Sequence, residues 1–219
     1  MFSFSEEKSE ILLYDVIGES HDGEGIHAAS VEAALQLMDG ERVTIRINSP
    51  GGIADEGVAI YNTLKRYPGG VDTVIDSLAA SAASIVALAG ETRTAMTGSR
   101  WMIHSAMGIA MGNAADMRKM TEVLTVYDNS LASIYALYMG LPQSEVLDLM
   151  AEETWYDGAA ALAAGLATSV DGNESKQKPQ NAAWFAHPPS DLLDSPLARL
   201  KPAPVARELA RARLRLAER

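Results

Sequence analysis

DSLAASAASIVALAGETRTAMTGSRWMIH, residues 76–104, joins a run of small residues to an apolar helical run and then to a strand-like run that ends in His104. Nothing large projects from the small-residue run, so a neighbouring segment of backbone can approach it closely. The first-turn N–H groups of a helix have no partner inside the helix, and their partial positive charge suits an oxyanion. A serine at that point can act as a nucleophile if a base reaches it. The competing interpretation is a buried helix with two structural serines, Ser81 and Ser84, and a core histidine.

Strands and helices alternate in the part of the chain that precedes this stretch. Apolar and β-branched runs predict strands at 11–17, 42–48 and 71–75, and apolar periodicity predicts helices at 31–38, with Ser30 as N-cap, and at 54–66. This alternation indicates βα units that build a largely parallel sheet. Sites in such folds collect at the carboxyl ends of strands. We therefore expect the glycine turn at 49–52 and the serines after 71–75 to lie at adjacent strand ends.

A long helix is predicted at 114–139, after an apolar glycine-bearing ribbon at 107–112. The apolar side chains of this helix cover more than one face, which favours an interface over an ordinary core helix. Two shorter helices are expected to follow, one that Pro142 opens and that runs to about 150, and one at 158–164 that Asp157 caps and Gly165 ends.

The composition excludes several classes of protein. The chain has 219 residues, enough for one domain with a full core, and its apolar content of 47% is typical of globular proteins. It contains no cysteine, which excludes a disulfide framework, a thiolate nucleophile and cysteine-based metal sites. The first residues lack the basic start and apolar core of a signal peptide, and no apolar run approaches the roughly 20 residues that span a membrane. The predicted compartment is cytoplasmic, without membrane association, and no metal or other cofactor is expected.

Charge divides the chain into an acidic body and a basic tail. Residues 1–171 hold 24 acidic and 9 basic side chains, a net charge of −15, whereas residues 172–219 hold 5 and 9, a net charge of +4. An acidic body argues against nucleic-acid binding, which uses a basic footprint. Residues 172–203 are polar and contain prolines, which predicts a linker, and 204–219 are predicted to form a basic amphipathic helical extension. We expect this tail to have a partner of its own; the alternative is a tail without a role.

Five short motifs lie in one order along the chain: NSPGG at 48–52, AIYNTL at 59–64, AASAA at 79–83, ALAG at 87–90 and MIH at 102–104. In that order and approximate spacing they resemble the ClpP serine peptidases. Each motif alone is weak, but together they extend the resemblance over about residues 10–171. The chain looks most like the phage and prophage branch of that family, the ClpP-related head maturation proteases.

The resemblance implies a role for particular residues. Ser81 matches the family's nucleophile and His104 its general base. The backbone N–H groups of Gly52, with Gly51 as a further candidate, and of Ala82 match the family's oxyanion hole. Ser84 is the rival nucleophile, but it lies inside the first helical turns, where its hydroxyl is expected to bond a local carbonyl.

The third member of the triad departs from the family's usual aspartate. Counted back from Gly165, the matching position falls on Glu153. A glutamate can also orient the imidazole and stabilise the imidazolium, although it is one methylene longer. Glu152 is the second candidate, Asp157 is assigned to the helix cap, and a solvated acidic turn is the competing interpretation for both glutamates.

The resemblance also implies a fold and an assembly. We expect one α/β domain at 1–171 of the ClpP/crotonase-like kind, with repeated βα units, a protruding handle made by the long helix and the ribbon, and a helical C-terminal extension. A ring-shaped homo-oligomer is implied, either a heptamer or a stacked double heptamer. Whether an unfoldase ATPase acts as a partner stays open.

The implied function is that of an ATP-independent serine endopeptidase, which hydrolyses peptide bonds through an acyl-enzyme. Its substrate is a protein or peptide, and a phage capsid or scaffold protein is a candidate. Two other functions stay open. One is a crotonase-like acyl-CoA enzyme, which needs neither Ser81 nor His104; the other is a non-catalytic, ring-forming scaffold relative.

Overall fold

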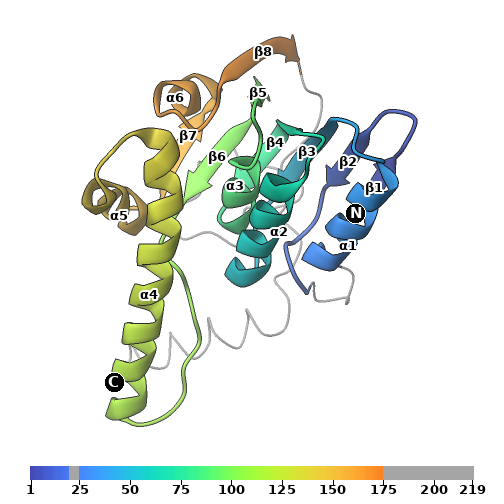
Figure 1. Ribbon diagram of the computed structural model, residues 1–219. Coiled ribbons are helices and arrows are strands. Elements are labelled where there is room, and N and C mark those ends of the chain that lie inside the picture. Colours follow the sequence, from blue (N-terminus) through green and yellow to red (C-terminus); the bar gives the residue numbers. More distant parts are fainter. Residues whose placement is uncertain (20–24, 175–219) are drawn as a thin grey trace, which may run out of the picture.

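The described part of this computed structural model, residues 1–19 and 25–174, is built on one mixed sheet (Figure 1). Its strands are β1 (Phe2–Ser5), β2 (Glu10–Leu13), β3 (Val43–Ser49), β4 (Val71–Ala80), β5 (Arg93–Thr97), β6 (Arg100–Ile103), β7 (Thr154–Asp157) and β8 (Ser169–Glu174). The order along the sheet is β1-β2-β3-β4-β5-β8, and all of these neighbours are parallel except the edge pair β1 and β2. The predicted parallel core is thus confirmed, whereas β1, β5, β7 and β8 were not predicted.

The long strand β4 carries two neighbours on the same side, one after the other. Its residues 73–75 pair with β5, and its residues 78–80 pair with β6 in parallel. Strand β6 in turn pairs antiparallel with β7. The predicted end of this strand at residue 75 was wrong, because Leu78, Ala79 and Ala80 are buried between β3 and β6 and continue the ladder. Sheet pairing outweighs the weak strand preference of alanine here.

Three helices, α1 (Ala28–Leu37), α2 (Ala54–Arg66) and α3 (Ala82–Ala87), lie together over the sheet in Figure 1, and a single apolar core cluster joins them to the strands. The prediction for α2 is confirmed residue by residue. Helix α1, however, begins at Ala28 rather than after Ser30, which lies inside its first turn. The Glu56 carboxylate on α2 accepts a hydrogen bond from the Ala28 N–H at 2.8 Å. A tertiary contact therefore serves the first N–H group of the helix, which has no partner inside the helix.

Helix α4 (Ala114–Met139) has the predicted bounds and extends away from the sheet at one side of the molecule (Figure 1). A capping box formed by Asn113 and Asp116 starts it, and Gly140 in the left-handed conformation ends it. Ribbon residues Met107 and Met111 and helix residues Val126 and Leu137 expose large apolar side chains.

The remaining helices connect α4 to the last strands. Helix α5 (Gln143–Ala151) starts after Pro142, which is its N-cap rather than its first residue. Helix α6 (Gly158–Ala163) has the predicted cap, because the Asp157 carboxylate accepts a hydrogen bond from the Ala160 N–H at 2.8 Å.

Strand β8 carries the described fold to Glu174, past the boundary expected at Asp171. The linker and the helical extension predicted for the tail lie outside the described residues. Within the described residues, no helix is both long enough and apolar enough to cross a membrane.

Candidate active site

Ser81 lies where β4 ends and α3 begins. Its backbone has φ of 53° and ψ of −128°, and its N–H donates to the Met102 carbonyl at 3.0 Å. A non-glycine residue at positive φ costs about 1–3 kcal/mol and persists only where its surroundings impose it. Here β6 imposes it through the bond to Met102, and the Ser81 side chain is left half-buried in a pocket.

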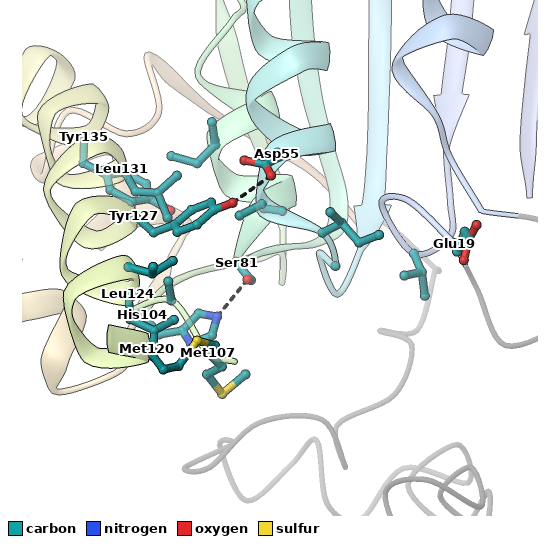
Figure 2. A pocket seen from close by; sticks show the side chains of 18 residues that line it. Glu19, Asp55, Ser81, His104, Met107, Met120, Leu124, Tyr127, Leu131 and Tyr135 are labelled. Atoms are coloured by element: carbon teal, nitrogen blue, oxygen red, sulfur yellow. Dashed lines mark hydrogen bonds between the residues drawn. The ribbon is translucent and has the colours of Figure 1, made fainter. Parts of the chain in front are cut away.

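His104 follows the end of β6, the strand that pairs with the end of β4. Its Nε2 lies 2.7 Å from the Ser81 Oγ (Figure 2). Burial lowers the pKa of His104, and the negative charges of Glu153 and then Asp128 oppose that shift. A lowered pKa keeps the imidazole neutral at pH 7, so that Nε2 can accept the serine proton while Nδ1 carries its own.

Strand register brings Glu153 close to His104, whose pKa its charge raises. Ile103 on β6 is paired with Thr154 on β7, so the next pair in this antiparallel register sets Glu153 across from His104. Glu153 also has positive φ, 53°, and its Oε1 accepts a hydrogen bond from the Trp155 Nε1 at 3.3 Å. Of the two carboxylates that raise the His104 pKa, Glu153 has the larger effect.

Two other acidic residues near Glu153 are directed elsewhere. The Asp157 carboxylate caps α6, and its residue pairs with Arg100 at the far end of β7. Glu152 is the exposed C-cap of α5. Neither contributes to the pKa shift of His104.

Two of the three residues that are candidate oxyanion donors line the pocket. Gly52 and Ala82 line it, and neither N–H has an acceptor in the part of the chain that the structure describes. The Gly51 N–H instead donates to the Ser49 Oγ at 3.1 Å, inside its own turn. Gly51 has another function, because a Cβ there would lie 2.5 Å from the Ala80 carbonyl oxygen; glycine thus allows the turn to approach the nucleophile.

Ser84 is fully buried, and its Oγ donates to the Ser81 carbonyl at 2.6 Å. The expected bond to a local carbonyl is thus confirmed.

The pocket beside Ser81 has a volume of about 600 Å³. Helix α4 forms one wall, with Met120, Leu124, Tyr127, Leu131 and Tyr135 lining it (Figure 2). Most of the lining is apolar. A hydrogen bond connects two of the lining residues, because the Tyr127 hydroxyl donates to the Asp55 carboxylate at 2.8 Å. Such a cavity suits an apolar side chain held next to a nucleophile.

Sequence reasoning missed two residues of α4 that act on this site. Asp128 accepts a hydrogen bond from the Ala106 N–H at 2.6 Å, just after His104, and helps to raise the His104 pKa. The Tyr135 hydroxyl lies 2.6 Å from the Ser84 Oγ, a polar contact that the apolar pattern of the helix does not indicate. The signal for Asp128 was a carboxylate within an otherwise apolar helical stripe.

Known proteins are similar to this chain in fold and in sequence. A single-residue mutant of ClpP1 from Listeria monocytogenes has a similar structure, with a TM-score of 0.67 over 77% of this chain and 94% of that one at 21% identity. The chain is 31% identical over 149 residues to the ATP-dependent Clp protease proteolytic subunit of Deinococcus radiodurans. The matched region covers 65% of this chain and 73% of that protein. The corresponding subunit of Bacteroides fragilis is 32% identical over 149 residues, with 65% and 72% covered.

The fold is therefore that of the ClpP-type α/β proteins. Residues 9–174, which are most of the chain, match the family described as Clp protease. The protein belongs to the Clp protease family.

Proposed function

We propose that this protein is a serine endopeptidase of the ClpP type, with Ser81 as nucleophile, His104 as general base and Glu153 as the orienting carboxylate. The observation that carries the proposal is the 2.7 Å contact between the Ser81 Oγ and the His104 Nε2 in a pocket that Gly52 and Ala82 also line. Family membership supports a peptidase in general.

The reaction is acyl transfer in two halves. His104 takes the Ser81 proton while Oγ attacks the scissile carbonyl, and the N–H groups of Gly52 and Ala82 stabilise the oxyanion that forms. His104 then gives its proton to the leaving amine, and an acyl-enzyme remains. Water attacks this ester by the same route in reverse, and Glu153 stabilises the imidazolium in both halves.

None of these chemical steps uses a nucleotide, so cleavage of a small peptide is proposed to be ATP-independent. The relatives from Deinococcus radiodurans and Bacteroides fragilis are described as subunits of an ATP-dependent protease. A requirement for an ATPase would then concern the delivery of folded substrates. For the natural substrate, the resemblance to head maturation proteases favours a phage capsid or scaffold protein.

The decisive test is a fluorophosphonate probe together with a fluorogenic peptide. Wild type should be labelled on Ser81 and should hydrolyse the peptide without ATP, and Ser81→Ala should lose both reactions while it keeps its fold and assembly. Loss of activity only in Ser84→Ala, with Ser81→Ala still active, would overturn the assignment. Absence of both reactions in the assembled wild type would favour the acyl-CoA or scaffold alternatives.

A further inference from the structure

A buried hydrogen-bond chain connects α4 to the backbone of the nucleophile. Tyr135 and Ser84 are both buried, and their hydroxyl oxygens lie 2.6 Å apart. The Ser84 Oγ is also 2.6 Å from the Ser81 carbonyl oxygen, which the Ser84 N–H approaches at 2.9 Å.

The direction of each bond follows from the number of protons. A carbonyl oxygen can only accept, so Ser84 must use its one hydroxyl proton on Ser81. Tyr135 must then donate its proton to the Ser84 Oγ. Burial raises the pKa of Tyr135, which keeps this donor protonated over the working pH range. The chain therefore runs from Tyr135 to Ser84 to the Ser81 carbonyl.

The Ser81 carbonyl belongs to the same peptide unit as the Ala82 N–H. A trans peptide is planar, and its C=O and N–H point in opposite directions. Two donors that hold the carbonyl oxygen therefore also fix the direction of the Ala82 N–H. The angle that they fix is the ψ of Ser81, −128°, at a residue whose φ is already strained.

We propose that Ser84 and Tyr135 are positioning residues that aim the Ala82 N–H at the oxyanion of the bound substrate. This inference rests on the proposed peptidase function. Ser84 acts on the peptide unit directly, whereas Tyr135 acts only through Ser84. The same bonds draw electron density toward the Ser81 carbonyl and make the Ala82 N–H a stronger donor.

The test compares four variants on a small fluorogenic peptide: Ser84→Ala, Tyr135→Phe, the double variant and Tyr138→Phe. Tyr138 is the matched control, because it lies on the same helix and its hydroxyl lies 2.9 Å from that of Tyr61 instead. Ser84→Ala should lower kcat by about tenfold, less than the 10²–10³ for loss of a whole oxyanion donor, with KM little changed. Tyr135→Phe should lower kcat by less.

The double variant tests whether Tyr135 acts only through Ser84. Its kcat should equal that of Ser84→Ala, because Tyr135 has no route to Ala82 once Ser84 is gone. A second readout is the affinity for a peptide aldehyde, whose tetrahedral adduct uses the oxyanion donors. That affinity should fall with kcat, while the affinity for the cleaved product peptide should stay at the wild-type value.

Three results would overturn the inference: wild-type kcat in a folded Ser84→Ala, losses that multiply in the double variant, or an equal loss in Tyr138→Phe. If Ser84→Ala does not fold, the split between kcat and KM in Tyr135→Phe decides. A peptidase that is active without Ser81 would instead refute the proposed function itself.

Discussion

Gly57 on α2 lies against Ala82 at the start of α3. A Cβ on Gly57 would come 2.9 Å from the Ala82 Cβ and 3.0 Å from its carbonyl oxygen, distances at which one of the two helices has to shift. A buried glycine in the middle of a helix is about 1 kcal/mol less favourable than alanine. Here it allows α2 to support the residue that carries the proposed oxyanion donor.

Gly57→Ala is therefore predicted to lower kcat about tenfold by displacing the Ala82 N–H. The gain in helix propensity should offset part of the strain, so that the melting temperature changes little. Asn62→Ala, an exposed position on the same helix, is the control for propensity alone and should retain wild-type kcat. Peptidase kinetics and thermal unfolding of both variants check the prediction, which fails if the two have the same kcat.

Glu153→Gln is predicted to keep much of the local geometry and to cut kcat/KM by orders of magnitude, since the imidazolium loses its counter-charge. It should also shift the pH profile. The charge of Glu153 raises the pKa of His104 against the effect of burial, so its removal lowers that pKa further. Because neutral His104 is the base, the acid limb of kcat/KM should move to lower pH.

Glu152→Gln, at an exposed position, is the control for Glu153→Gln and should match wild type in both rate and pH profile. An unshifted acid limb and a wild-type rate in Glu153→Gln, with an inactive Glu152→Gln or Asp157→Asn, would show that the count from Gly165 chose the wrong acid.

The sequence allowed the elements with local signals to be predicted. Helices α2 and α4 have the expected bounds, because apolar periodicity and the break at Gly140 are encoded within each segment. The end of β4 could not be predicted, since residues 78–80 form a strand only through their neighbour β6. The prediction of where α1 starts was wrong for the same reason, because the first N–H group of this helix bonds to Glu56 on another helix.

In the candidate site too, residues that carry a local motif could be predicted, whereas contacts made only by the tertiary structure could not. Ser81 and His104 were accessible from the motifs, and the structure sets them 2.7 Å apart. Tyr135 and Ser84 are 51 residues apart, and the bond between them depends on how α4 lies against α3. Nothing in either segment alone indicates that contact.

The family resemblance implies assembly into a ring, and the exposed apolar side chains of the handle favour an interface there. Val126 and Leu137 on α4 are 69% and 78% exposed, and Met111 in the ribbon is 98% exposed, in a chain whose body is acidic. Large apolar side chains this exposed on a protruding element favour a protein interface. Sedimentation velocity at micromolar concentration should show a heptamer or a double heptamer.

Val126→Asp is expected to shift that population toward smaller species, because it places a charge in the apolar contact. Asn62→Asp adds the same charge at an exposed position on α2 and should leave the sedimentation profile unchanged. A monomeric wild type would contradict the prediction of a ring.

The last prediction concerns the basic tail, and the structure fixes where to cut it. Because β8 pairs with β5 as far as Glu174, a truncation must keep that residue and remove 175–219. All proposed catalytic residues precede Asp171, so hydrolysis of a small peptide should be unchanged.

The tail carries net positive charge, whereas the body carries −15, and this contrast favours docking of the tail on the body or on an acidic partner. Its removal should therefore change assembly or the choice of protein substrate, and the difference from wild type should shrink in high salt. Loss of small-peptide activity in a truncated protein that still forms the ring would mean that the tail belongs to the active site.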